Sequence, residues 1–577
     1  MKQLIRYRKR EKEFKGKIKI LFAVILVLFA IVFFRLLYIN FFEEKVLKGA
    51  KDSVKIINVQ NYRGSILDRN GVPLAISYPV GYIYVYKFFL FSDEKKKEQF
   101  IKGLSRILKI PQEEIRKKLS KNKDVFELIT FPLEKAEEIR NFIRRIDYDK
   151  DKKMYTKPFI TAHVGVGQKY LRFYPHKYFA SNLIGFVKKE GGGGEGLEYQ
   201  FDRYLTGHEE KGKKIILYRD KGILFIEPKD YGFYEPKDLV LSLDYRVQSV
   251  IEEIKKKIRR KWKPKKIVII VMESDTGKIR GFTTFPDYDP NRYERFFPIF
   301  TRNFGTYDLF EIGSTFKPFL VAYAVDKGFI KKNSLIDINY GKLRVYKKII
   351  RDPIKYLRKK KYITPAEVLI YSSNVGAIKI GMRLSPEDFD KLFSTFRMKK
   401  TPKIIFSENN PQISDLHNKV NKAYASIGQG IAYNALHLLT SFNALIQGKY
   451  VKPSILEKEE VQTEPLDISP STVIWLRSIL IQVVEKGTGK NAKSDLFYIG
   501  GKTGTAQKYD RKIKTYSKEK LTTFFIGFFP KSPKFTAIIL VDEPKGKNIY
   551  GGKVAAPYFK ELAERIASIY GLKPDKK

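Results

Sequence analysis

The order of strand-like and helix-like segments in the second half of the chain restricts the possible folds most. Two β-rich runs on either side of Asp275-Thr276-Gly277 predict a hairpin. Many helix-like segments follow, and three successive strand-like runs and a closing helix over about residues 553–570 come near the end. Strands that are interrupted by helices and then resume predict one antiparallel sheet with helices packed on it, an α+β fold.

A change in the pattern at about residue 236 divides the chain into two parts. From that point a strand end leads into an amphipathic helical pattern that Asp244 is placed to cap. Residues 42–235 instead mix short strand-like runs with charged segments, and residues 94–147 have a helical pattern. Asn70-Gly71 predicts a hairpin turn within this part. We therefore expect a mixed α/β domain over residues 42–235 and a second domain over residues 236–577.

The N-terminal segment predicts one membrane crossing. Ile20 to Phe34 is apolar without interruption, and the run continues past Arg35, so it reaches the roughly 20 residues that span a bilayer. A dense basic cluster precedes it, and cationic flanks stay in the cytoplasm. A cleaved signal peptide is the alternative, but no small-x-small site follows the apolar run. We expect a cytoplasmic tail (1–19), a retained transmembrane helix (20–41) and a catalytic part outside.

Composition excludes several functional classes. The 577 residues carry a formal charge of +48, but the cations are scattered and no nucleic-acid motif occurs, so we expect no nucleic-acid partner. A Lys-rich composition of the kind seen in hyperthermophiles explains the charge, with some attraction to anionic lipids or wall polymers. Cysteine is absent, and the histidines lack paired spacing, so we expect no metal site. The glycine run at residues 191–194 lacks the context of a phosphate-binding loop.

Ser314 and Lys317, in the stretch EIGSTFKPF, form the first candidate catalytic pair. Positions i and i+3 share one helix face, so the lysine can lie over the serine oxygen. A lysine that is desolvated loses its proton more easily and can act as the base that a serine nucleophile needs. Alone, this spacing is common on solvated helix surfaces and carries little weight.

Two further stretches strengthen the interpretation. YSSNVG supplies Ser372, Ser373 and Asn374, and GGKTGTAQK supplies Lys502–Thr505. Together with Ser314 and Lys317 they follow the order S-x-x-K, S-x-N, K-T-G, the signature of penicillin-binding proteins and class A β-lactamases.

On these motifs the chain resembles a class B penicillin-binding protein, specifically the division-type (septal) peptidoglycan D,D-transpeptidase. The resemblance extends to the stretches RGSILDRNG, RFYP, EGLEYQFDRYLTG, ASIGQGIAYNALHL and FFIGFFP. It implies that residues 42–235 form a pedestal domain and residues 236–577 a penicillin-binding/β-lactamase-like transpeptidase domain. Ile312 stands where the family usually has proline, and the pedestal is shorter than in many members.

The resemblance also implies roles. Ser314 attacks the carbonyl between the last two D-alanines of a stem pentapeptide, and Lys317 takes its proton. Ser372 passes a proton to the leaving amine, and Asn374 holds Lys317 and the substrate amide. The remaining positions, which bind the substrate backbone and its carboxylate, are Lys502, Thr503, Gly504 and Thr505. This acyl transfer needs no cofactor.

Alternatives within and beyond this class remain. The same motifs serve an elongation-type transpeptidase, a D,D-carboxypeptidase, a β-lactamase or a β-lactam sensor. The size, anchor and pedestal disfavour a β-lactamase, and the complete motifs disfavour a non-catalytic sensor. By resemblance we expect stem pentapeptides and β-lactams as ligands, and a polytopic membrane glycan polymerase and other division proteins as partners.

Overall fold

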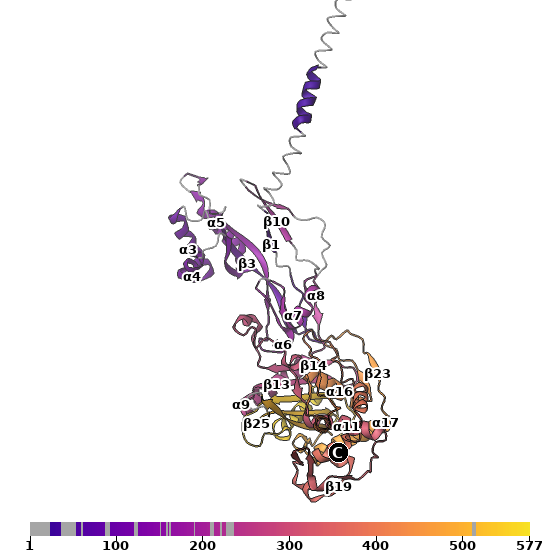
Figure 1. Cartoon of the computed structure of the whole chain (residues 1–577). Coiled ribbons are helices and arrows are strands. Elements are labelled where there is room, and N and C mark those ends of the chain that lie inside the picture. Colours follow the sequence, from indigo (N-terminus) through magenta and orange to yellow (C-terminus); the bar gives the residue numbers. More distant parts are fainter. Residues whose placement is uncertain are drawn as a thin grey trace, which may run out of the picture. The chain divides into compact units, whose positions relative to one another are not determined.

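The computed structural model describes most of the chain. The described residues are 23–35, 54–58, 62–86, 93–120, 125–149, 152–156, 160, 163–189, 191–207, 213–219, 222–226, 236–510 and 515–576. They fall into two compact units: residues 1–61 together with 208–234, and residues 62–207 together with 235–577. Each unit is described by itself (Figure 1).

The first unit contains a small antiparallel sheet. Its strand order is β1 (Val54–Asn58), β10 (Lys213–Arg219), β11 (Gly222–Ile226). Residues 23–35 are helical with exposed side chains. Among the residues described, no helix is both long and apolar enough to cross a bilayer. The predicted tail, and residues 20–22 and 36–41 of the predicted transmembrane helix, lie outside the described residues.

The second unit begins with a hairpin that joins its two parts. β2 (Ile66–Leu67) pairs antiparallel with β3 (Pro73–Tyr86), and the predicted Asn70-Gly71 turn lies between them. On its other side β2 pairs in parallel with β12 (Leu239–Val240). β3 continues outward and pairs with β4 (Val125–Pro132) and β7 (Val164–Phe173).

The helical prediction for residues 94–147 is wrong over one segment. Helices α3 (Glu94–Leu108), α4 (Gln112–Leu119) and α5 (Ala136–Ile146) are present, but β4 lies between α4 and α5. The VFELITFP sequence of β4 is rich in aromatic and β-branched residues, which favour a strand when a partner is available. β3 supplies that partner, and the pairing overrides the helical pattern on either side.

A five-stranded antiparallel sheet organises the rest of the unit. Its order is β14-β13-β26-β25-β24. The strands are β13 (Lys266–Glu273), β14 (Ile279–Phe285), β24 (Gly500–Asp510), β25 (Thr515–Phe529) and β26 (Phe535–Asp542). The predicted hairpin at Asp275–Gly277 joins β13 to β14, and the three predicted C-terminal strands are β24, β25 and β26. Among the described strands, β24 pairs with β25 alone, so it is an edge strand.

Helices cover both faces of this sheet, because successive strand residues point to opposite sides. On one face, Ile267 and Ile269 pack with α9 (Tyr245–Trp262) and α19 (Ala556–Ile569). On the other face, Val268 and Ile270 join a large core with α11 (Lys317–Asp326), α13 (Asn374–Gly381), α16 (Ala435–Gln447) and α17 (Pro470–Glu485). Asp244 caps α9 as predicted, accepting a hydrogen bond from Arg246 N–H.

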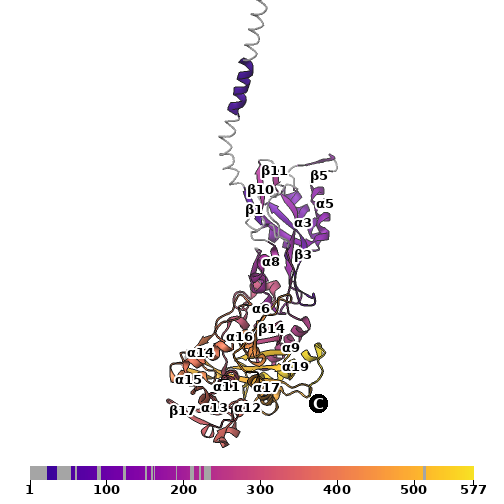
Figure 2. The ribbon, with the colours of Figure 1, turned by 90° about the vertical axis from the view of Figure 1, so that its right-hand side faces the viewer.

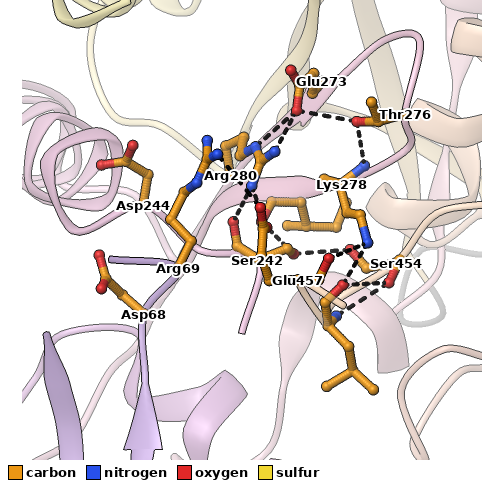
Figure 3. Close-up of polar contacts among 12 residues, drawn as sticks. Asp68, Arg69, Ser242, Asp244, Glu273, Thr276, Lys278, Arg280, Ser454 and Glu457 are labelled. Carbon is orange, nitrogen blue, oxygen red and sulfur yellow. Dashed lines mark hydrogen bonds and ion pairs between the residues drawn. The ribbon is translucent and has the colours of Figure 1, made fainter. Parts of the chain in front are cut away.

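Polar contacts fasten the β2–β3 hairpin to the sheet domain (Figure 3). Asp68 Oδ2 accepts a hydrogen bond from Tyr245 N–H at 2.9 Å, at the start of α9. Arg69 lies 3.4 Å from Glu457, which also accepts from Arg280 at 2.6 Å. Lys278 Nζ donates to three main-chain carbonyls of residues 456–459. The loop at 454–459 is thereby held against both the hairpin and β14.

Candidate active site

The turn that carries Ser314 is shaped by glycines. Ser314 lies in a 3₁₀ turn, η4 (Gly313–Phe316), that leads directly into α11. Gly313 has φ +51°, a left-handed conformation that glycine adopts at little cost, and its N–H donates to Gly428 O at 3.0 Å. A Cβ on Gly428 would lie 2.0 Å from Gly313 O. Both glycines are therefore required for the close approach of the 428–430 loop to the turn.

The residue that departs from the family pattern forms a hydrogen bond that proline could not make. Ile312 is fully buried, and its N–H donates to Ile431 O at 3.1 Å. This bond lies next to the pairing of β15 (Phe310–Glu311) with β21 (Ile431–Tyr433). The substitution thus adds one main-chain bond beside the catalytic turn.

Lys317 reaches the second motif. Its side chain is fully buried, and Nζ donates to Ser372 O at 2.8 Å, to Asn374 Oδ1 at 2.8 Å and to Ser372 Oγ at 3.3 Å. Burial penalises the ammonium form and lowers the pKa of Lys317 to about 7, while the Asp352 carboxylate acts in the opposite direction. A substantial fraction of Lys317 is therefore neutral near pH 7 and can accept a proton.

The second motif is held by an aspartate that sequence reasoning missed. Asp352 is fully buried and accepts from Ser373 Oγ at 2.7 Å and from Asn374 N–H at 2.6 Å. Ser373 Oγ in turn accepts from Gly376 N–H and caps α13. Ser372, just before the cap, has φ +55°, a strained conformation for a residue with a side chain. This backbone directs Ser372 Oγ toward the two lysines of the site.

Lys502 on β24 meets the same hydroxyl from the other side. It is fully buried, and its Nζ donates to Ser372 Oγ at 2.9 Å and to Thr503 O at 3.1 Å. Burial, reinforced by the nearby positive charge of Lys317, lowers the pKa of Lys502 well below its ordinary value. Ser372 Oγ is thus a hydrogen-bonded bridge between two lysines.

The remainder of the third motif lines the edge of β24. Thr503 Oγ1 donates to Thr488 Oγ1 at 3.0 Å, and Thr505 Oγ1 accepts from Gly551 N–H at 3.0 Å. Thr505 is exposed, so its hydroxyl hydrogen can be offered to a ligand. A Cβ on Gly504 would lie 2.8 Å from Thr315 Cγ2, so only glycine fits beside the turn.

The structure brings all three predicted motifs into one cluster, with one difference. Sequence reasoning placed Lys317 over the Ser314 oxygen, but within the described residues no hydrogen bond joins these two side chains. Lys317 instead contacts Ser372 and Asn374. Ser314 is half-buried, and catalytic hydrogen bonds often form only once substrate is bound.

Glu311 is a half-buried acid beside the turn that had no predicted role. Its Oε1 accepts from Tyr516 Oη at 2.9 Å, and burial raises its pKa. Its position three residues before Ser314 was visible in the sequence, but its partner on β25 was not. Asp352 offered one sequence cue, because it is the only acidic residue in a long basic stretch.

The best-buried of the described histidines has no contact with this cluster in the described residues. His437 is buried in α16, where its Nε2 lies 2.8 Å from Arg397 O, and burial lowers its pKa to about 4. It is therefore a neutral core residue. In the part of the chain that the structure describes, no group of three or more His, Asp or Glu side chains is arranged to hold a metal ion.

Comparisons with known proteins match this architecture. A family model described as the penicillin binding protein transpeptidase domain matches residues 267–564. A second, described as the penicillin-binding protein dimerisation domain, matches residues 58–227. The chain belongs to the penicillin-binding protein family.

Relatives of this penicillin-binding protein match it along nearly its whole length. It is 30% identical to the peptidoglycan D,D-transpeptidase FtsI of Buchnera aphidicola, covering 98% of this chain and 97% of the relative. It is 29% identical to the stage V sporulation protein D of Bacillus subtilis, covering 96% and 86%. It is 28% identical to the probable peptidoglycan D,D-transpeptidase PenA of Neisseria meningitidis, covering 97% and 94%.

A solved structure shares the fold. Penicillin binding protein 3 of Mycobacterium tuberculosis, complexed with aztreonam, aligns with a TM-score of 0.65 at 18% identity, over 89% of this chain and 98% of that one. This similarity supports the mixed α/β fold with pedestal and transpeptidase domains.

Proposed function

We propose that this penicillin-binding protein is a serine D,D-transpeptidase that crosslinks peptidoglycan stem peptides through a seryl acyl-enzyme. The observation that carries the proposal is the buried Lys317, whose pKa of about 7 and contacts with Ser372 and Asn374 suit a base next to Ser314. Relatives with the names FtsI and PenA are D,D-transpeptidases by name and support the same reaction.

Acylation begins with transfer of the Ser314 hydroxyl proton. Neutral Lys317 takes the Ser314 hydroxyl proton as Oγ attacks the carbonyl between the two terminal D-alanines. The tetrahedral oxygen gains negative charge, and the main-chain N–H groups of Ser314 and Thr505 are the proposed donors to it. One such donor is worth about 3 kcal/mol by mutagenesis in serine hydrolases.

Departure of D-alanine requires a proton on its amine. Ser372 Oγ is bridged to both Lys317 and Lys502, so it can deliver its own hydrogen and be resupplied from a lysine. The C–N bond breaks, D-alanine leaves, and the peptide remains as an ester on Ser314. The amine of a neighbouring stem peptide then attacks this ester and gives up a proton to the same groups. The new C–N bond forms the crosslink, the ester C–O bond breaks, and Ser314 Oγ regains a proton from Lys317.

The edge of β24 is proposed to position the substrate peptide. An extended peptide can add to this free edge by main-chain hydrogen bonds. Lys502 and the hydroxyls of Thr503 and Thr505 are the proposed partners of the terminal carboxylate.

The biological setting is also proposed. A retained helix over residues 20–41 would anchor the enzyme in the cytoplasmic membrane with residues 42–577 outside. A septal role is supported by the Ser-Ser-Asn form of the second motif and by the FtsI-type relatives. Partners would be a polytopic membrane glycan polymerase and other division proteins. A tagged protein spread along the lateral wall instead of midcell would favour the elongation-type role.

A mass spectrum tests the acyl-enzyme. The full-length protein incubated with penicillin should gain the mass of one intact penicillin, persistently, and Ser314→Ala should gain none. Loss of the adduct within seconds would indicate a β-lactamase, and no adduct on the wild type would indicate a non-catalytic protein. A soluble pentapeptide with an added acceptor amine separates transpeptidation from carboxypeptidation, since a carboxypeptidase yields only the hydrolysed peptide.

A further inference from the structure

One small region beside the active site is strongly basic and nearly free of acidic residues. Residues 339–362, here called the cationic module, contain seven lysines and three arginines against one aspartate, a net charge of +9. That is ten cations in 24 residues, whereas the whole chain has 111 in 577, so the module is about twice as basic as the chain average. Its elements are η5 (Asn339–Gly341), β17 (Lys342–Val345), β18 (Lys348–Arg351), η6 (Lys355–Lys359) and the start of β19 (Tyr362–Ile363).

Among the described residues, the positive charge of the module is largely left without carboxylate partners. Its one acid, Asp352, is fully buried and bonded to the second motif, so it offers no charge at the surface. Across the described residues, none of the ten cations forms an ion pair with a carboxylate. Some exposed cations elsewhere do, for example Arg565 with Glu253 at 2.7 Å and Lys257 with Glu561 at 2.6 Å. Unpaired like charges repel each other, so this surface is arranged to meet an anion.

Four tyrosines lie among these cations with their rings exposed. Tyr346 is 73% exposed, and the others are Tyr340, Tyr356 and Tyr362. Lysine ammonium groups lie over three of the rings: Lys347 over Tyr346, Lys360 over Tyr356 and Lys361 over Tyr362, each between 5.3 and 5.5 Å from the centroid. Exposed tyrosine presents an apolar ring with a polar tip, which packs on the faces of sugar rings. Sugars and carboxylates together are the ligand chemistry that this surface matches.

The module is attached to the catalytic motif. Asp352 follows β18 directly and binds Ser373 and Asn374, and β18 packs against α13. The ring of Tyr356 lies 4.7 Å from that of Tyr371, the residue just before Ser372. In the view of Figure 2, β17, α13 and α12 (Pro365–Ile370) are drawn at the lower end of this part of the chain, and β17 pairs with β18. The module therefore lies directly beside the residues of the second motif.

We propose that the cationic module is a docking surface for the peptidoglycan strand itself, whose sugars pack on the exposed tyrosines and whose peptide carboxylates pair with the lysines. The inference rests on the proposed function, because it takes the polymer from that reaction. It assigns polymer recognition to a surface outside the cleft that binds the scissile peptide. A small β-lactam has no sugars to pack on the exposed tyrosines, so its reaction with Ser314 should not depend on the exposed lysines and tyrosines of the module.

Binding of uncrosslinked, pentapeptide-bearing glycan strands to full-length protein tests the proposal. In a Ser314→Ala background, the triple variant Lys347→Glu, Lys348→Glu, Lys359→Glu should bind the strands at least about tenfold more weakly. The strand affinity of the Ser314→Ala protein without the charge reversals should fall as salt is added. The strand affinity of the triple variant should depend less on salt. Tyr346→Ala should weaken binding without changing the salt dependence.

A matched control removes the effect of total charge. Lys117→Glu, Lys256→Glu, Arg260→Glu changes the net charge equally, at exposed cations without ion pairs on α4 and α9. With Ser314 restored, both triple variants should react with penicillin at the wild-type rate, whereas crosslinking of the polymer should fall in the module variant alone.

The results separate the two proposals. If the module variant reacts with penicillin at the wild-type rate and also binds strands as tightly as the protein without the charge reversals, the docking inference alone is overturned. Equal weakening by both variants, or binding of the module to anionic phospholipid vesicles in place of the strands, would also overturn it. Failure of the wild type to react with penicillin would instead overturn the proposed function.

Discussion

Replacing Asp352 with asparagine should move the pH dependence of acylation. The buried carboxylate raises the pKa of Lys317, against the larger lowering by burial. Asparagine keeps the shape and can still accept from the N–H groups of Asn374 and Val375, which lie 2.6 and 3.0 Å from Oδ1. Its amide can donate to Ser373 Oγ. The variant should therefore fold, with a lower pKa at Lys317.

The magnitude follows from titration. With a pKa of about 7, Lys317 is roughly 10% neutral at pH 6 and roughly 90% neutral at pH 8. If the neutral amine is the base, the wild-type acylation rate constant rises about tenfold between these two pH values. In Asp352→Asn the neutral fraction at pH 6 is larger, so the rate at pH 6 relative to pH 8 increases, by at most about tenfold.

The assay is the second-order rate constant for labelling by a fluorescent penicillin between pH 5.5 and 8.5. Asp275→Asn, an exposed aspartate in the β13–β14 turn, is the matched control and should leave the profile unchanged. If the rate constant reached at high pH falls and the midpoint of the profile also shifts, Asp352 also orients α13. A midpoint that stays in place or moves to higher pH would refute the electrostatic reasoning.

Three further outcomes are expected. Because the pKa of Lys317 is lower in the folded protein than its ordinary 10.5, the unfolded chain binds an extra proton between pH 7 and 10.5. Lys317 should therefore make the free energy of unfolding of the wild type rise with pH in this range. Between pH 7.5 and 9, urea denaturation should show a rise about 2 kcal/mol smaller in Lys317→Met than in the wild type. Gly428→Ala should lower penicillin acylation by about a hundredfold with the circular dichroism spectrum retained, since its Cβ collides with Gly313 O. Ile312→Pro should lower stability by about 1 kcal/mol through the lost bond to Ile431 while acylation stays within about twofold.

Much of the sheet domain could be predicted because its cues are local. The turn at Asp275–Gly277, the cap at Asp244 and the C-terminal strands each follow from residue types within a few positions. β4 could not, because a strand between two helices is decided by its pairing with β3, far away in sequence. The helical prediction was wrong at β4 because pairing with β3 outweighed the helical pattern of the neighbouring residues.

The candidate site could likewise be predicted only in part from the sequence. The three motifs name the reacting groups, but not how the buried groups share their hydrogen bonds. That Lys317 bonds to Ser372 and Asn374, and that Asp352 organises the same motif from 21 residues upstream of Ser373, depends on burial and long-range contact. Neither has a periodic pattern along the chain.

The position of β24 at the rim of its sheet has a consequence for inhibition. This strand leaves one row of its peptide groups without a neighbouring strand, next to a glycine with no side chain to obstruct approach. What it selects is the shape of an extended main chain, a feature that any short peptide mimic can copy without a strained ring. Compounds that imitate a missing sixth strand, and end in a carboxylate, should compete with penicillin reversibly and without any covalent chemistry.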